Sequence, residues 1–309
     1  MRRHVFCGAA ILLVALLAPA LAAETTPPAP VAADASRIVA IGGTVTEVLY
    51  ALGLEDNVVG VDLTSDFPER AAEKPKVGYM RALSAEGVLA LAPTLILAIE
   101  DAGPPETIAV LESASVAFVR VPKPGTAGEV ADTIRLIADT VGVPDKGAAL
   151  ASAVSADLAT VAAMLAEVDA RRRAVFVLGL NGGAPLAAGS DTAAADVFAL
   201  ARIDNALAGM QGYKPVSDEA GVAAAPDAVV LMADQTHGLS DDVVLAAPAF
   251  AGTPAARDGR LIRVSGSYLL NFGPRTAHAV RDLAAALYPE LALPALPERP
   301  WTADAGGRD

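Results

Sequence analysis

The chain has 309 residues, of which 53% are hydrophobic and 4% aromatic, and its formal net charge is -13. This length is sufficient for two domains with a large buried core. The negative charge argues against nucleic acid or an anionic membrane surface as a partner. The sequence is rich in alanine, valine and leucine, which is typical of an α/β protein.

The N-terminus has the pattern of a secretory signal peptide. Residues 2–4 are basic, residues 5–17 are apolar but too few to span a bilayer comfortably, and small residues follow up to Ala22. We expect residues 1–23 to be removed on export to the periplasm. The only cysteine, Cys7, lies inside this segment, so the mature chain contains no disulfide.

Short apolar runs in the first half of the chain alternate with segments of helical periodicity. Strands are expected at 37–41, 58–61, 94–98 and 116–121, and helices at 44–52, 85–91, 104–113 and 125–141. Strands that alternate with helices form parallel sheets, and ligands bind beyond the carboxyl ends of such strands. Gly42-Gly43 is only weak evidence for a phosphate site, because no P-loop or dinucleotide-binding pattern surrounds it.

Residues 145–168 form a helical pattern that would span roughly 36 Å. The alternation then begins again, with strands expected at 175–178, 227–232 and 261–264, and helices at 193–200 and 274–287. We therefore expect two Rossmann-like α/β lobes with parallel central sheets, joined by a single long helix. The expected divisions are a disordered tether at 24–35, an N-terminal lobe at 36–143, a linking helix at 144–170, a C-terminal lobe at 171–290 and a disordered tail at 291–309.

An internal repeat supports the two-lobe plan. Leu83-Ser84-Ala85-Glu86 is followed by Ala92-Pro93 and a strand, and Val216-Ser217-Asp218-Glu219 is followed by Ala225-Pro226 and a strand. The offset is 133 residues for both the glutamates and the prolines. In each copy a serine can cap a helix whose glutamate lies near the positive end of the dipole. The shared order and spacing favour two similar lobes with a cleft between them.

A tyrosine and an arginine two residues apart lie just before the first of these capped helices. Tyr79 and Arg81 follow a break at Lys74-Pro75, and we expect them on a loop, where side chains reach ligands. In extended backbone both project to the same side. A phenol beside a fixed positive charge loses its proton more easily, and the phenolate suits ferric iron, which tyrosine binds axially in some haem proteins. The alternative interpretation is a tyrosine at the core edge with a surface arginine.

Four motifs together resemble the haem-binding periplasmic proteins of bacterial haem ABC importers, which are helical-hinge (class III) binding proteins. The resemblance covers about residues 37–288, and its motifs are Val77-Gly78-Tyr79-Met80-Arg81, Arg37-Ile38-Val39 with Gly42-Gly43, Tyr213-Lys214-Pro215-Val216-Ser217 and Phe272-Gly273-Pro274-Arg275-Thr276.

The resemblance implies a site and a set of partners. Tyr79 matches the axial ligand of haem iron, and Arg81 matches the arginine that stabilises the phenolate. Ferric haem b would be the transported ligand, captured for iron acquisition. Glu86 and Glu219 match the lobe-tip glutamates that dock onto an inner-membrane ABC permease dimer with its ATPase, and a symmetric pair of carboxylates suits a symmetric dimer. An outer-membrane haem receptor system would lie upstream.

One position departs from the family pattern. Some members place a histidine ligand in the turn after the first strand of the second lobe, where this chain has Asn181. We therefore expect five-coordinate haem or a water in the sixth position. The candidate haem contacts from the second lobe, including cations for the propionates, are Tyr213, Lys214, Tyr268, Arg275, Asn181 and His237.

Other functions fit the sequence less well. A corrinoid or ferric-siderophore carrier of the same fold is the main alternative, and it would not require Tyr79. Zinc or manganese transport is disfavoured because the mature chain has two histidines. An exported hydrolase is disfavoured because the sequence lacks Gly-x-Ser-x-Gly and His-Glu-x-x-His patterns, and we expect no enzymatic activity. A structural or adhesive role would leave the cleft without a purpose.

Overall fold

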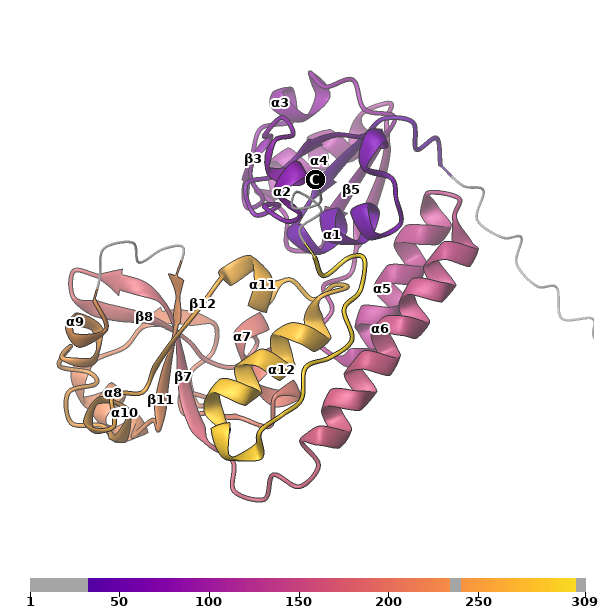
Figure 1. The fold of residues 1–309 in the computed structure, drawn as a ribbon. Coiled ribbons are helices and arrows are strands. Elements are labelled where there is room, and N and C mark those ends of the chain that lie inside the picture. The colour runs from indigo at the N-terminus through magenta and orange to yellow at the C-terminus, as the bar shows by residue number, and fades with distance from the viewer. Residues whose placement is uncertain (1–32, 234–239, 304–309) are drawn as a thin grey trace, which may run out of the picture. The chain divides into compact units, whose positions relative to one another are not determined.

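The computed structural model describes residues 33–233 and 240–303, and Figure 1 shows its ribbon. The expected signal peptide, most of the expected tether and His237 lie outside these residues.

A parallel four-stranded sheet forms the first lobe, in the order β2-β1-β5-β6. All residues of β1 and β5 are buried, as expected for parallel strands covered on both faces. The strands are β1 (Ile38–Ile41), β2 (Val58–Val61), β5 (Leu95–Ile99) and β6 (Ala117–Val121), and a short antiparallel hairpin consists of β3 (Gly78–Tyr79) and β4 (Ala82–Leu83). The helices are α1 (Gly43–Ala51), α2 (Glu69–Ala72), α3 (Ala85–Leu89), α4 (Pro105–Ser113) and α5 (Ala127–Thr140).

The second lobe contains a mixed sheet, in the order β10-β8-β7-β11-β12, with β9 paired to β7. Strands β7, β11 and β12 are parallel as predicted, and the short β9, which was not predicted, also pairs with β7 in parallel, but β8 and β10 are antiparallel. The strands are β7 (Arg173–Asn181), β8 (Ala184–Ala188), β9 (Asp204–Asn205), β10 (Tyr213–Pro215), β11 (Ala228–Met232) and β12 (Leu261–Val264). The helices are α7 (Ala193–Leu200), α8 (Asp218–Ala224), α9 (Asp241–Leu245), α10 (Pro254–Arg257), α11 (Gly266–Leu270) and α12 (Thr276–Leu287).

The antiparallel part of the second sheet starts at a hairpin turn. Gly182 and Gly183 have φ angles of 59° and 91°, a conformation that favours glycine and matches a two-residue hairpin. The chain therefore returns along β7 as β8 before it enters α7. The sequence indicated the turn but not the strand that follows it.

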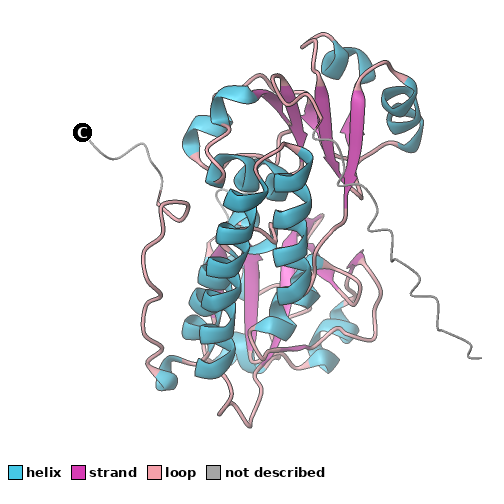
Figure 2. Cartoon of the chain, turned by 90° about the vertical axis from the view of Figure 1, so that its right-hand side faces the viewer, coloured by secondary structure: helices cyan, strands magenta, loops and turns pink. Residues whose placement is uncertain are grey.

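The linking helix is α6 (Pro144–Met164), which ends earlier than the predicted 144–170. At 1.5 Å per residue its length is roughly 31 Å. It packs along α5 and α12, as Figures 1 and 2 show. A Cβ on Gly147 would lie 2.2 Å from the Cβ of Ala138, so glycine is needed where α6 meets α5. By length and hydropathy α6 resembles a membrane span, but its apolar face, including Leu150 and Val154, is buried in the protein core.

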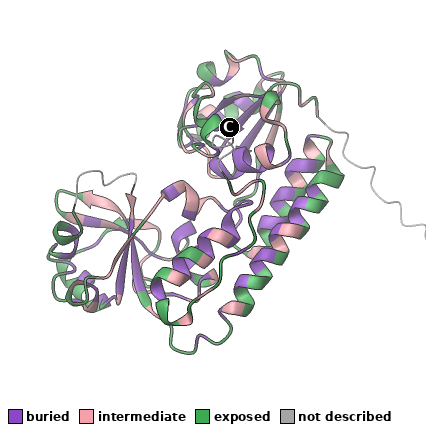
Figure 3. Cartoon of the chain, in the orientation of Figure 1, coloured by how far each residue is buried: buried purple, intermediate pink, exposed green. Residues whose placement is uncertain are grey.

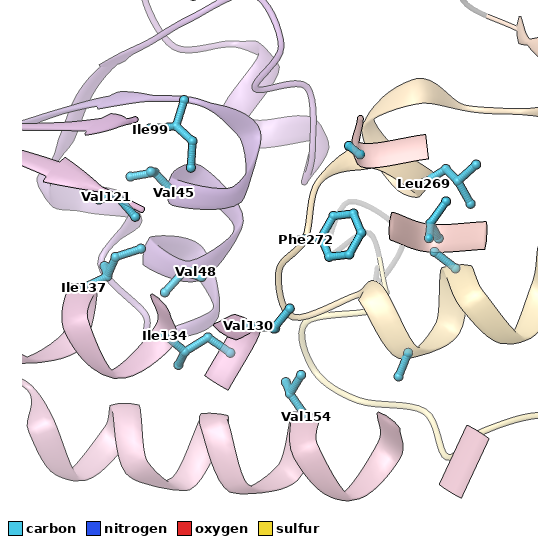
Figure 4. Close-up of a cluster of buried hydrophobic side chains, with 14 of the residues drawn as sticks. Val45, Val48, Ile99, Val121, Val130, Ile134, Ile137, Val154, Leu269 and Phe272 are labelled. Carbon is cyan, nitrogen blue, oxygen red and sulfur yellow. The ribbon is translucent and has the colours of Figure 1, made fainter. Parts of the chain in front are cut away.

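One buried cluster runs from the first lobe through α5 and α6 to α12. Figure 4 shows part of it and labels Val45 and Val48 of α1, Ile134 of α5, Val154 of α6 and Phe272 among its members. A second cluster, which includes Phe250, covers the other face of the second sheet. The buried strands and the exposed outer helix faces are visible in Figure 3.

The two lobes repeat the same local structure, as the internal repeat predicted. The hydroxyl of Ser84 accepts a hydrogen bond from the Gly87 amide at the start of α3, and the Ser217 hydroxyl accepts one from the Ala220 amide at the start of α8. These are the expected helix caps.

The ends of these two helices are also alike. Ala92 and Ala225 have φ angles of 45° and 43°, a left-handed conformation that is uncommon for alanine. Arg37 donates to the Ala92 carbonyl at 2.9 Å, and Arg173 donates to the Ala224 carbonyl at 3.0 Å. The two lobes therefore share helix starts, helix ends and the strands that follow them.

The described part of the expected disordered tail is ordered against the protein. Leu296 is buried, and the Arg299 guanidinium donates to both carboxylate oxygens of Asp157 in α6, at 2.7 and 3.0 Å. The Trp301 indole donates to the carbonyl of Pro274. The prediction of disorder is wrong for residues 291–303, because a buried leucine, an arginine and a tryptophan hold this proline-rich segment in place.

Candidate functional site

A cavity of about 630 Å³ is lined by residues of both lobes. As predicted, it lies beyond the carboxyl ends of the parallel strands: Asp101 follows β5, Lys123 follows β6, and Met232 ends β11. The other wall residues used below are Gly43, Asp66, Tyr79, Arg81, Tyr213 and Asn271.

Tyr79 lies on the wall of this cavity, in the β3–β4 hairpin. Tyr79 is 42% exposed, which is unusual for a large aromatic residue and leaves the side chain accessible to a ligand. Met80, next in the chain, is buried instead. The hairpin turn therefore buries the methionine in the cavity wall and leaves the tyrosine exposed there.

The Arg81 guanidinium donates a hydrogen bond through Nη1 to the Tyr79 phenol oxygen at 2.9 Å. The predicted proximity is confirmed, although its cause differs: Arg81 lies in the hairpin turn rather than in extended backbone. Arg81 also donates through Nη2 to Asp101, a contact that the sequence did not indicate. Burial works most strongly to lower the pKa of Arg81, but Asp101 and Tyr79 together raise it, so the guanidinium stays charged.

Lys123 is the second cation on the cavity wall. Among the described wall residues, only Arg81 and Lys123 carry a positive charge. Burial raises the pKa of Asp196 in α7, and Lys123 opposes this rise electrostatically. Sequence reasoning missed Lys123, because a single lysine after a strand gives no pattern.

Tyr213 is the one candidate haem contact from the second lobe that lies on the wall within the described residues. Burial raises the pKa of its phenol, while the Ala194 amide and the Thr192 hydroxyl act in the opposite direction. The phenol is therefore held near the start of α7 in its neutral form. His237 lies outside the described residues, and the prediction about it stays untested.

Three other candidates do not line the cavity. Asn181 is exposed at the end of β7, and Lys214 is exposed in β10. The Tyr268 hydroxyl donates to the carboxylate of Asp282 at 2.7 Å, and burial is the main cause that raises the pKa of Tyr268.

Arg275 is buried and does not line the cavity. Its guanidinium donates to both oxygens of Glu47 in α1, at 2.7 and 2.9 Å, and lies 3.5 Å from the centre of the Phe67 ring. Because these partners occupy it, Arg275 is unavailable for a propionate. The expected haem contact is instead a buried ion pair that joins the two lobes.

Asn271 of the second lobe also binds the Glu47 carboxylate of the first lobe. Its amide donates to Glu47 at 3.2 Å, and a Cβ on Gly43 would lie 2.0 Å from the Asn271 side-chain nitrogen. Glycine at this position therefore permits close approach of the lobes, which explains the second residue of the Gly42-Gly43 pair without a phosphate.

Glu86 and Glu219 are both exposed in the first turns of α3 and α8. The pKa of Glu219 is lowered by its own backbone amide and by the Ser217 hydroxyl, so it carries a negative charge at neutral pH. The repeat therefore presents an equivalent exposed carboxylate on each lobe.

Comparisons with known proteins agree with this architecture. The family model for "Periplasmic binding protein" matches residues 38–268. The solved structure of the periplasmic heme-binding protein BhuT in complex with two hemes is 38% identical with a TM-score of 0.78, over 82% of this chain and 98% of that one. The periplasmic heme-binding protein RhuT from Roseiflexus sp. RS-1 is 36% identical with a TM-score of 0.78, over 83% and 99%.

Two curated relatives cover most of the chain at lower identity. The uncharacterized ABC transporter substrate-binding lipoprotein YvrC of Bacillus subtilis is 27% identical, over 83% of this chain and 81% of that protein. The vitamin B12-binding protein of Vibrio parahaemolyticus is 24% identical, over 80% and 87%. The matches confirm the two-lobed α/β fold and the resemblance that the motifs predicted. The chain therefore belongs to the periplasmic binding protein family, together with the periplasmic heme-binding proteins of known structure.

Proposed function

We propose that this protein captures ferric haem b in the cavity between its lobes and delivers it to an inner-membrane ABC importer, without catalysing a reaction. The observation that carries the proposal is an exposed phenol on the cavity wall with a guanidinium 2.9 Å from its oxygen. A cation at that distance favours the phenolate, which binds ferric iron. Similar proteins of known structure are named as periplasmic heme-binding proteins.

Haem transport also fits the rest of the chain. The expected signal peptide would send it to the periplasm, where haem uptake for iron acquisition takes place. Tyr79 alone would ligate the iron, with the sixth position open or filled by water. An outer-membrane receptor upstream stays a prediction from the resemblance.

A corrinoid carrier is the alternative, because vitamin B12-binding relatives match the chain. Ligand choice separates the two functions. We expect the purified chain, titrated with hemin and separately with cyanocobalamin, to bind hemin with a high-spin ferric spectrum and to leave cobalamin unbound. Tight cobalamin binding without hemin binding would replace the proposal with the alternative.

We propose that Lys123 binds a haem propionate, since it is exposed on the cavity wall and Arg81 is occupied by Tyr79 and Asp101. Lys123→Gln should weaken hemin binding by about fivefold at low salt, as expected for a solvent-exposed charged hydrogen bond, and by less at high salt. The measurement is a hemin titration at two salt concentrations.

The matched control is Lys214→Gln, which removes an exposed lysine that does not line the cavity. It should leave hemin affinity unchanged. Equal losses in the two variants would mean that Lys123 acts only through net charge.

We propose that Glu86 and Glu219 dock onto cationic residues of the permease dimer. The Glu86→Lys and Glu219→Lys double variant should retain its hemin affinity but lose at least tenfold in stimulation of the importer's ATPase, because like charges would face each other across the interface. Glu167→Lys, at an exposed position after α6, is the charge-matched control. Undiminished stimulation by the double variant would exclude docking through these residues.

A further inference from the structure

We propose that Asp101 is a positioning residue, whose carboxylate holds the Arg81 guanidinium against the phenol oxygen of Tyr79. The consequence for haem rests on the proposed function, but the arrangement of the three side chains does not. Asp101 lies outside the four sequence motifs and has no role in what the resemblance implies.

The contacts of Arg81 show how the anchoring works. Nη1 donates to the Tyr79 oxygen and Nη2 donates to the Asp101 carboxylate, so the two partners occupy different nitrogens of one planar group. The Arg81 side chain is 51% exposed. An arginine so exposed in a hairpin turn would adopt several rotamers without a second contact. Asp101 restricts it to the rotamer that reaches the phenol.

Backbone hydrogen bonds fix Asp101 relative to the hairpin. The Gly103 amide donates to the Met80 carbonyl at 2.8 Å, and the Leu83 amide donates to the Gly103 carbonyl at 3.0 Å. On the other side, the Glu100 amide donates to Val121 in β6. The loop after the buried strand β5 thus carries Asp101 and the hairpin as one framework, and the three side chains are arranged before a ligand arrives.

The negative charge of Asp101 and its contact with Arg81 have opposite effects on the phenol. A carboxylate near the phenol disfavours the phenolate, but the guanidinium lies between them in direct contact with the phenol oxygen. Because Coulomb energy falls with distance, the guanidinium has the larger effect. A positioning role and a purely electrostatic role therefore predict opposite effects for removal of the carboxylate.

The experiment compares Asp101→Ala with Asp101→Asn. Both changes remove the negative charge, but asparagine keeps an oxygen that can accept from Arg81. Apo protein is titrated with alkali while phenolate absorbance is followed, and the Tyr79 signal is taken as the difference from Tyr79→Phe. Burial raises the pKa of the other tyrosines, that of Tyr50 to about 12, so their signals lie at high pH.

We expect Asp101→Ala to move the Tyr79 midpoint upward and to weaken hemin binding by about tenfold, a typical loss for a charge-assisted contact. Asp101→Asn should restore the midpoint to the wild-type value or below it, and the affinity to within about threefold of wild type. Asp66→Ala, which removes another carboxylate from the cavity wall, controls for net charge.

Three outcomes would overturn the proposal. These are equal downward shifts of the midpoint in the alanine and asparagine variants, no shift in either, or a shift in Asp66→Ala as large as in Asp101→Ala. If wild-type protein failed to bind hemin, the proposed function would fall, while the apo titration would still decide the role of Asp101.

Discussion

Glu47→Ala is expected to lower the free energy of unfolding by about 3–5 kcal/mol, because it leaves the Arg275 guanidinium buried without a carboxylate. The side chains of Glu47 and Arg275 are 2% and 8% exposed, and two hydrogen bonds of 2.7 and 2.9 Å join them. Urea unfolding at 25 °C would measure the change from the midpoint and slope. The loss should be large because the same carboxylate also accepts a hydrogen bond from Asn271, which lines the cavity.

A surface ion pair offers a matched control. Glu55 and Arg70 are 3.5 Å apart, and their side chains are 30% and 51% exposed. Glu55→Ala should cost less than about 1 kcal/mol. A double variant, Glu47→Leu with Arg275→Met, should recover most of the stability, because apolar groups of similar size replace both charges. If Glu47→Ala cost no more than Glu55→Ala, the buried pair would not join the lobes as described.

Tyr79→Phe is expected to weaken hemin binding by at least about 100-fold. Loss of groups that only support a metal ligand typically costs 10- to 100-fold, and loss of the ligand itself should cost no less. Phenylalanine keeps the ring and its apolar contacts, so the change isolates the oxygen. Competition of each variant with a haem-binding reference protein would measure the affinities.

Tyr213→Phe is the matched control for Tyr79→Phe, since it removes the other phenol oxygen of the cavity wall within the described residues. Its expected effect is at most about tenfold, the value of a neutral hydrogen bond. A larger loss in Tyr213→Phe than in Tyr79→Phe would move the iron ligand to the second lobe.

The fold was largely predictable because its signals are local. Buried parallel strands appear as apolar runs, as in Leu95–Ile99, and the helix caps at Ser84 and Ser217 recur at a fixed spacing. The strand β8 was not predictable, because its sequence Ala184–Ala188 contains proline and little β-branched character.

In the candidate site too, contacts between residues close in the sequence were predictable, and contacts between distant residues were not. Tyr79 and Arg81 are two residues apart, so their contact was predictable from sequence. Asp101 is 20 residues from Arg81, and only the loop after β5 brings them together.

Longer separations account for the predictions that the structure corrects. Arg275 was predicted to bind a propionate because the sequence does not reveal its partner Glu47, which is 228 residues away. The tail was predicted to be disordered because the sequence does not reveal that Arg299 pairs with Asp157, which is 142 residues away. In both cases an arginine that the sequence suggests is exposed to solvent forms hydrogen bonds with a carboxylate of a distant element.

The bond between the Tyr79 oxygen and iron is the central claim, and resonance Raman spectroscopy of the hemin complex tests it most directly. Excitation in the phenolate-to-iron charge-transfer band should show iron-bound phenolate modes in wild-type protein and in Tyr213→Phe. These modes should be absent from Tyr79→Phe. Phenolate modes that persist in Tyr79→Phe, or a wild-type complex without them, would contradict the account.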